Sequence, residues 1–173
     1  MRKIITVEAR MGSSRFPGKV LSSLGSYSSL EFQLERLKKV SNADKIIVAT
    51  TTEDVDDAIE YVCDNIGVGC FRGSNEDVLS RLSGAVIKFN ADVIIQTTGD
   101  CPLIDPWIIE SMIEEYEASP MDIDMVSNCI NRSFPIGLDC RIINANTLLS
   151  INDACKDPIH RSHGTTYIYA SED

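Results

Sequence analysis

The stretch KIITVEARMGSSRFPGKVL, residues 3–21, decides the fold of this chain. It begins with a short β-branched apolar run, which predicts a buried strand, and it continues into a loop of Gly, Ser and Pro. Arg10, Arg15 and Lys19 lie in that loop. The stretch therefore predicts a strand whose carboxyl end opens into a flexible, positively charged loop.

The charge of the whole chain contrasts with this loop. The 173 residues include 26 Asp and Glu against 16 Lys and Arg, which gives a formal net charge of −10 at pH 7. An acidic chain lacks the broad basic footprint that binds duplex nucleic acid, so we expect no nucleic-acid partner. A few local cations are instead typical of a site for a small anionic ligand.

Length and composition favour a single domain over residues 1–173. Hydrophobic residues make up 43% of the chain, which is enough to bury a core at this length. No apolar run approaches the ~18 residues of a membrane span, so we expect no membrane partner. The six cysteines have no CxxC spacing and no signal peptide precedes them, which predicts free buried thiols and a cytoplasmic location.

Predicted strands and helices alternate along the chain. After residues 3–9, strands are predicted at 45–51, 92–100, 124–128 and 138–143, and a short strand or turn at 67–73. Helices are predicted at 28–40, 53–67, 74–91, 105–119 and 144–156. This order implies βαβ crossovers and a mostly parallel sheet with helices on both faces, which is an α/β fold.

Two polar segments follow strands of this predicted sheet. The basic loop follows the first strand, and TTGDCPLID, residues 97–105, follows the strand that begins at residue 92. Because ligands of open α/β sheets bind outside the carboxyl ends of the strands, we expect Asp100 to face the basic loop across one cleft. A carboxylate in that position can hold Mg²⁺. Asp105, directly before Pro106, is better placed than Asp100 to cap the next helix.

The loop is not a Walker A motif. Five residues separate Gly12 from Gly18, and Val20 stands where the magnesium-binding hydroxyl would be. A P-loop ATPase is therefore not predicted. Gly12 and Gly18 still permit backbone angles that bring N–H groups close to an anion.

Five segments carry a family resemblance, and together they span nearly the whole chain: EARMGSSRFPGKVL (8–21), FRGSNEDVLSR (71–81), TTGDCPLIDP (97–106), FPIGLDCRI (134–142) and HRSHGTTYI (160–168). In this order they resemble the signature segments of the cytidylyltransferase family typified by spore coat polysaccharide biosynthesis protein F, which is related to the CMP-KDO and CMP-sialic acid synthetases. The resemblance implies a Rossmann-like nucleotide-diphospho-sugar transferase fold. It also implies transfer of CMP from CTP to an acidic sugar, with release of pyrophosphate, in surface or spore-coat polysaccharide biosynthesis.

The same resemblance implies roles for individual residues. Arg15, Lys19 and Asp100 are the implied catalytic residues, with Mg²⁺ on Asp100. The implied contacts to CTP are Ala9, Arg10, Met11, Gly12, Ser13, Arg15, Lys19, Arg72, Asp77 and Thr98. The implied sugar-side residues are Asp139, His160 and His163. A homodimer is also expected, because relatives commonly form one.

The sequence departs from the family pattern in two places. Family members usually continue through a strand resembling VDTPEDL that supplies a second metal carboxylate, and this sequence ends at IYASED. The resemblance therefore predicts a domain that lacks the C-terminal part of the family. The usual REH reads RSH here, with Ser162 in place of an acid, which predicts an altered sugar side.

Two other functions stay open beside the cytidylyltransferase. A glycosyltransferase that uses a preformed nucleotide sugar has the same kind of fold. Its DxD metal motif is mimicked by DID, residues 122–124, although that segment does not follow an apolar strand and is predicted to be a solvated turn. A catalytically impaired nucleotide-binding remnant is the other alternative.

Overall fold

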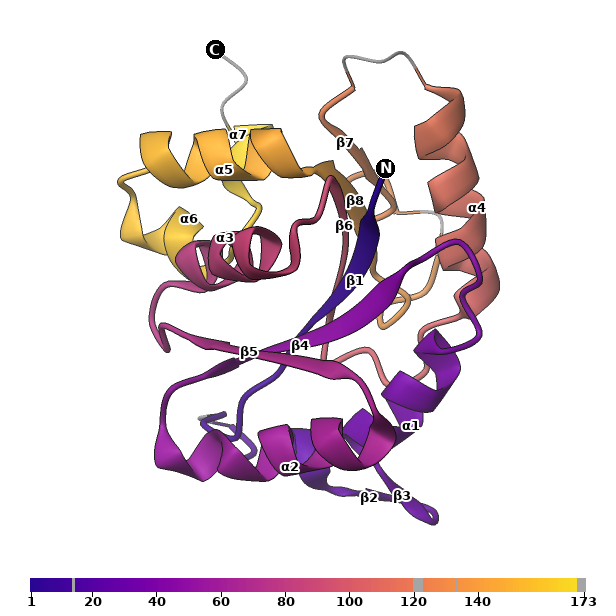
Figure 1. Ribbon diagram of the computed structural model, residues 1–173, viewed down its shortest axis with the longest axis vertical. Coiled ribbons are helices and arrows are strands. Elements are labelled where there is room, and N and C mark those ends of the chain that lie inside the picture. The colour runs from indigo at the N-terminus through magenta and orange to yellow at the C-terminus, as the bar shows by residue number, and fades with distance from the viewer. Residues whose placement is uncertain (14, 120–122, 133, 171–173) are drawn as a thin grey trace.

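A six-stranded sheet forms the centre of the computed structural model, which describes residues 1–13, 15–119, 123–132 and 134–170 (Figure 1). Its strands are β1 (Lys3–Glu8), β4 (Lys45–Thr51), β5 (Gly69–Gly73), β6 (Val93–Thr98), β7 (Met125–Ser127) and β8 (Arg141–Asn144). They are ordered β5-β4-β1-β6-β8-β7. The first four are parallel, and β8 runs antiparallel to both β6 and β7. The predicted mostly parallel sheet is confirmed.

Helices cover both faces of the sheet, as predicted (Figure 1). One face carries α1 (Ser29–Leu37), α2 (Asp57–Ile66) and α4 (Pro106–Ala118), and the other carries α3 (Val78–Phe89) and α5 (Ala145–Ala154). The smaller elements are the hairpin β2–β3 (Ser23–Leu24 and Tyr27–Ser28), the 3-10 turns η1 (Lys19–Leu21) and η2 (Asp54–Asp56), and the short helices α6 (Pro158–Ser162) and α7 (Tyr167–Ala170). None of these smaller elements was predicted from the sequence as a separate element.

The alternation of side chains along the strands explains the two layers of helices. In β1, Ile4 and Ile5 are both fully buried, but they belong to different hydrophobic cores on opposite faces. Ile94 and Ile95 of β6 divide in the same way. Because neighbouring residues of a strand point to opposite faces, a strand that is apolar at every position needs cover on both.

Local signals set most of the helix ends. Ser28 and Glu31 form the predicted capping box at the start of α1, and the Asp105 carboxylate accepts a hydrogen bond from the Trp107 N–H at the start of α4. Gly67 ends α2 in the left-handed region, with φ of 78°. The predicted helix at 53–67 was wrong at its first turn, where the chain forms η2 before α2 begins.

The order of the strands places a switch point between β1 and β6. From β1 the chain passes to β4 and β5 on one side, and it then crosses back through α3 to β6 on the other side. The Gly99 N–H donates to the Glu8 carbonyl oxygen at 2.8 Å. A Cβ at Gly99 would lie 3.2 Å from that oxygen and 3.1 Å from Val20, so glycine allows the two strand ends to approach.

Two general expectations can be compared with the described residues. Within the described ranges, no helix is long and apolar enough to cross a membrane. All six cysteines are free, as predicted, and four of them are buried, whereas Cys70 and Cys129 are half-buried.

Replacing Leu34 with alanine tests the packing of α1 on the sheet. Leu34 is fully buried, so Leu34→Ala is expected to lower the free energy of unfolding by about 2–5 kcal/mol, measured by urea denaturation. Glu35→Ala, on the exposed side of the same helix, is the control and should change it by less than about 0.5 kcal/mol. Equal stability of the two variants would contradict this packing.

Candidate functional site

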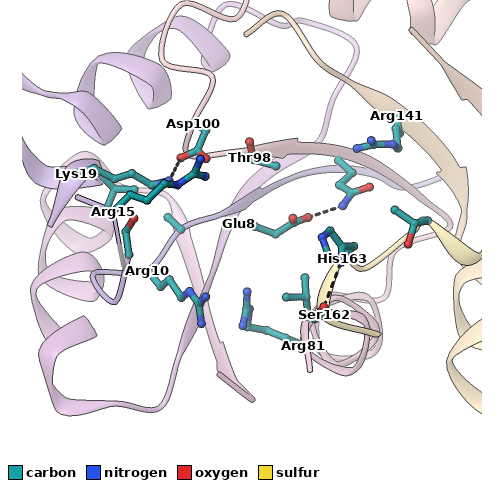
Figure 2. A pocket seen from close by; sticks show the side chains of 16 residues that line it. Glu8, Arg10, Arg15, Lys19, Arg81, Thr98, Asp100, Arg141, Ser162 and His163 are labelled. Carbon is teal, nitrogen blue, oxygen red and sulfur yellow. Dashed lines mark hydrogen bonds and ion pairs between the residues drawn. The ribbon is translucent and has the colours of Figure 1, made fainter. Parts of the chain in front are cut away.

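A cavity of about 430 Å³ opens at the carboxyl ends of β1 and β6 (Figure 2). This volume lies within the range of small-molecule binding sites. Five of its sixteen lining residues are Arg or Lys and two are carboxylates, in a chain of net charge −10. The cavity is therefore a local concentration of positive charge at the switch point of the sheet, where ligands of such folds bind.

Eight of the residues predicted from the sequence line this cavity together. The loop contributes Arg10, Arg15 and Lys19, and the end of β6 contributes Thr98 and Asp100. The remaining three are Ala9, Ser13 and His163. The expectation that Asp100 faces the basic loop across one cleft is confirmed.

Backbone hydrogen bonds give the basic loop its shape. The Met11 carbonyl oxygen accepts from the N–H groups of Ser13 and Gly18, both at 2.9 Å. Gly18 has φ of 72°, in the left-handed region that favours glycine, and it leads directly into η1 and Lys19. Gly12 has no such angle, so the expected use of glycine freedom applies to Gly18 alone.

The buried Asp56 anchors the loop to the sheet. Its side chain is 1% exposed, and Oδ1 accepts from the Met11 N–H at 2.7 Å. Oδ2 accepts from the N–H of Thr51 at 3.3 Å and also from the Thr51 hydroxyl. Asp56 therefore ties the start of the loop to the end of β4, and this inward turn explains why η2 precedes α2.

Lys19 and Asp100 form an ion pair at the mouth of the cavity. Lys19 Nζ lies 2.5 Å from Asp100 Oδ1, and the two side chains are 30% and 56% exposed. Solvent screens a pair this exposed, so it contributes little to folding stability. Its significance is that an ammonium group and a carboxylate meet where the two strand ends meet.

Asp100 is the carboxylate that the resemblance implies as a metal ligand. Among the described residues there is no cluster of three or more His, Cys, Asp or Glu that could hold a metal ion. A protein cage for Zn²⁺ or Ca²⁺ is therefore not found in the described ranges. A single exposed carboxylate is compatible with Mg²⁺, which keeps several waters and takes most of its remaining ligands from substrate phosphates.

Two arginines close the cavity on the side of α3. Arg10 Nη1 donates to the Asn75 side-chain oxygen at 2.7 Å, which links the loop to the segment before α3. Arg81 is 3% exposed, and its Nη1 donates to the Ser74 carbonyl oxygen at 2.5 Å. Burial lowers the pKa of Arg81, and its Nε has no hydrogen-bond partner within the described part of the chain.

A hydrogen-bonded chain of three side chains leads from the cavity lining, at Glu8 and Gln96, to the buried Thr165. Gln96 Nε2 donates to Glu8 Oε1 at 2.7 Å, and the Thr165 hydroxyl donates to Gln96 Oε1 at 2.6 Å. Burial raises the pKa of Glu8 to about 6, although the bond from Gln96 and the charges of Arg81 and Arg141 oppose the shift. Glu8 is therefore an inward-facing carboxylate that titrates near neutral pH.

Arg72 was predicted near the nucleotide, but the structure does not place it in this cavity. Its guanidinium donates to Asp57 at 2.5 Å, to Glu60 at 3.0 Å and to the Thr51 carbonyl oxygen at 2.9 Å. Phe71, the preceding residue of β5, packs toward α3, so alternation sends Arg72 toward α2 on the other face. The position of Arg72 therefore does not support the predicted contact to CTP.

Five further predicted residues also lie outside the cavity lining. Asp77 caps α3 through the Ser80 N–H and pairs with Arg161 at 2.7 Å. Asp139 receives two hydrogen bonds from Arg132, at 2.7 and 2.9 Å, which lower its pKa. The remaining three are Met11, Gly12 and His160, whose Nδ1 lies 3.1 Å from the Thr166 hydroxyl.

The DID segment falls partly outside the described residues. Asp122 lies there, so the predicted solvated turn at 122–124 is not tested. Asp124 is described, and its Oδ1 accepts a hydrogen bond from the Thr147 hydroxyl at 2.5 Å.

Half of the lining was not among the predicted site residues, although Ser162 was noted as a departure from the family pattern. The missed residues are Glu8, Val20, Val78, Arg81, Gln96, Arg141, Ser162 and Thr166. Two of them carry a signal in the sequence: Glu8 is a charge at the end of a buried apolar run, and Arg81 interrupts the apolar face of a predicted helix. Such a charge in an apolar pattern indicates either a pairing or a site, but only the fold shows which.

The anchor at Asp56 can be tested by Asp56→Ala. The substitution leaves the N–H groups of Met11 and Thr51 without their acceptor, so the free energy of unfolding should fall by about 2–4 kcal/mol. Hydrogen exchange of the Met11 amide should become faster than that of the β1 amides. Unchanged exchange at Met11 would contradict the anchor, and Asp54→Ala, on the exposed side of η2, is the control.

Glu8 gives a pH-dependent stability that Glu8→Gln removes. Because the folded pKa, about 6, lies above the ordinary value of 4.5, stability from this group is present below pH 4.5 and is lost as the pH rises through 6. The full effect is about 2 kcal/mol. Between pH 5 and pH 8, the free energy of unfolding of the wild type should fall by about 1 kcal/mol relative to that of the variant, measured by urea denaturation. A parallel pH dependence of both proteins would contradict the raised pKa.

Comparison with known protein families gives a match over nearly the whole chain. A family model described as Cytidylyltransferase matches residues 4–172. The chain is 34% identical over 171 residues to the spore coat polysaccharide biosynthesis protein SpsF of Bacillus subtilis, covering 95% of this chain and 69% of that protein. It is 32% identical over 132 residues to the 8-amino-3,8-dideoxy-manno-octulosonate cytidylyltransferase of Shewanella amazonensis, covering 73% of this chain and 52% of that protein.

A solved structure agrees with these matches. A cytidylyltransferase from Leptospira borgpetersenii superimposes with a TM-score of 0.95 at 36% identity. The superposition covers 99% of this chain and 72% of that structure. The sheet, the basic loop and Asp100 all lie within the matched region.

Proposed function

Because the chain belongs to the cytidylyltransferase family, we propose that it transfers CMP from CTP to an acidic sugar and releases pyrophosphate. The observation that carries the proposal is the cavity at the β1–β6 switch point, in which the basic loop faces Asp100. The name of the Shewanella relative specifies a sugar acid as substrate, which supports the acceptor class. A role in surface or spore-coat polysaccharide biosynthesis is part of the proposal, by similarity to SpsF.

The loop residues are proposed to hold the triphosphate. Arg15 and Lys19 present a guanidinium and an ammonium group to the cavity, and Arg10 is held against Asn75 at its edge. Phosphate oxygens accept hydrogen bonds from such groups strongly because the bonds are charge-assisted. A triphosphate also offsets the excess of positive charge in the lining.

The chemistry asks mainly for alignment and for neutralisation of charge. A hydroxyl oxygen of the sugar forms a bond to the α-phosphorus of CTP and gives up its proton to solvent. The bond from that phosphorus to the bridging oxygen breaks, and pyrophosphate leaves with the electron pair. Arg15 and Lys19 stabilise the negative charge that develops on the leaving group. Mg²⁺ held by Asp100, when bound, supplies Lewis-acid polarisation of the phosphate oxygens.

A pyrophosphate-release assay with each of the four NTPs and a panel of acidic sugars tests this function. We expect release with CTP, and we expect Lys19→Ala and Asp100→Asn each to lower the rate about a hundredfold, because each removes about 3 kcal/mol of transition-state stabilisation. Lys39→Ala, an exposed lysine at the end of α1, is the matched control. Near-normal release by Lys19→Ala would contradict the assignment.

The same assay separates the alternative functions. A glycosyltransferase would release a nucleoside diphosphate from a sugar donor and no pyrophosphate from CTP. A nucleotide-binding remnant would bind CTP in calorimetry without turnover. The homodimer and the cytoplasmic location stay predictions.

A further inference from the structure

The cavity has a far end, formed by Glu8, Gln96, Arg141 and His163, that the proposed contacts to the triphosphate do not use. In Figure 2, Glu8 is drawn between the Lys19–Asp100 pair and Arg141, with Arg141 on the side away from the loop. All of these residues line the same cavity. The far end is therefore available to the molecule that reacts with the bound nucleotide.

Glu8 offers one unused acceptor at this far end. Its Oε1 accepts from Gln96 Nε2 at 2.7 Å, and within the described residues no hydrogen bond reaches Oε2. The Thr165 hydroxyl holds the other side of the Gln96 amide at 2.6 Å, so the amide N–H faces Glu8 in a fixed orientation. An ionised Glu8 therefore presents a free carboxylate oxygen to the cavity.

Two arginines of the cavity lining, Arg81 on the side of α3 and Arg141 at the far end, keep a donor without a partner within the described residues. Arg81 and Arg141 each have a buried Nε without a hydrogen-bond partner, and neither forms an ion pair within the described ranges. Arg81 is 97% buried, since its exposed fraction is 3%. Both charges act on Glu8, but neither arginine donates a hydrogen bond to it. A buried Nε without a hydrogen-bond partner, on an arginine that forms no direct ion pair, is a donor that an anionic ligand can satisfy.

The free groups at the far end define the chemistry of their ligand. A molecule that fits them has an anionic group for a guanidinium and a hydrogen-bond donor for the Glu8 oxygen. A bare phosphate chain does not fit, because its ionised oxygens offer no donor for a carboxylate. A sugar acid fits, because its carboxylate and its hydroxyl or amino groups lie on one small frame.

We propose that Glu8 and Arg141 determine which acidic sugar this chain accepts. Arg141 donates to the carboxylate of the sugar, and Glu8 accepts a hydrogen bond from a hydroxyl or amino group of the same molecule. The inference rests on the proposed function, which it deepens by assigning the acceptor end of the cavity. Gln96 and Thr165 act as positioning residues, because they orient the amide that faces Glu8.

Substitutions at the two residues test the proposal. Glu8→Gln keeps the size of the side chain and removes its charge, and Arg141→Gln removes the guanidinium. Glu114→Gln makes the same chemical change as Glu8→Gln on the exposed side of α4, and it is the matched control. The probes are 3-deoxy-manno-octulosonate, its 8-amino derivative, and the methyl ester of the acid that binds better.

Binding is measured by calorimetry with and without Mg²⁺ and CTP, and KM is measured by pyrophosphate release. Glu8→Gln should weaken binding of the better acid and raise its KM about 10–100-fold, as expected for loss of a charge-assisted hydrogen bond. It should change the Kd for CTP less than about twofold, because the triphosphate is bound at the other end of the cavity. If Glu8→Gln weakens binding of the 8-amino derivative more than binding of 3-deoxy-manno-octulosonate, the donor is the amine. Equal losses of affinity identify the donor as a hydroxyl.

Arg141→Gln tests whether Arg141 binds the carboxylate of the sugar. It should weaken binding of the acid about 10–100-fold and leave binding of the methyl ester within about threefold. Equal losses for acid and ester would overturn the role of Arg141.

Several results overturn the proposal, and they differ from a failure of the proposed function. It is overturned if Glu8→Gln binds the acids within threefold of the wild type, if it loses CTP affinity as much as acid affinity, or if neither acid binds the wild type. An absence of CTP binding counts against the cytidylyltransferase function instead. The acceptor titrations without nucleotide still decide the role of Glu8 in that case.

Discussion

The hydrogen bond from the Gly99 N–H to the Glu8 carbonyl oxygen, 2.8 Å long, joins the carboxyl ends of two strands about ninety residues apart in sequence. Lys3–Glu8 pairs with Val93–Thr98 in parallel register along the whole of both strands. The loop that leaves one strand and the aspartate that follows the other are therefore forced to share one cavity. Because Gly99 has no Cβ, the backbone directly after β6 can lie against Ala9 and Val20.

The electrostatics of the site follow from this arrangement. A chain with a net charge of −10 concentrates five arginines and lysines around one cavity, and only two carboxylates accompany them. The carboxylates differ in environment: Asp100 is more than half exposed and pairs with Lys19, whereas Glu8 faces inward and has a raised pKa. Two acidic groups within one cavity are thus prepared for different tasks by burial and by their neighbours.

Buried polar groups away from the cavity support its shape. Asp56 holds the start of the loop through the Met11 N–H, and Gln33 donates to the Thr98 carbonyl oxygen at 2.9 Å from α1. Each of these bonds connects a helix-side residue to a backbone group at a strand end. The position of the basic loop is therefore determined partly by Asp56, a residue outside the loop, and not by its own glycines alone.

Most elements and the basic loop were determined by the sequence itself, because their signals are local: β-branched runs for β1 and β4, a capping box at Ser28, and Pro106 after Asp105. The meeting of the loop with Asp100 was also predictable, since parallel strands gather their carboxyl ends at one edge. The tertiary structure alone decided the direction of Arg72, the anchor at Asp56 and the chain from Glu8 through Gln96 to Thr165. These contacts depend on strand register and on which face of a strand each side chain occupies, and no pattern within one segment specifies the partner that another segment will bring to it.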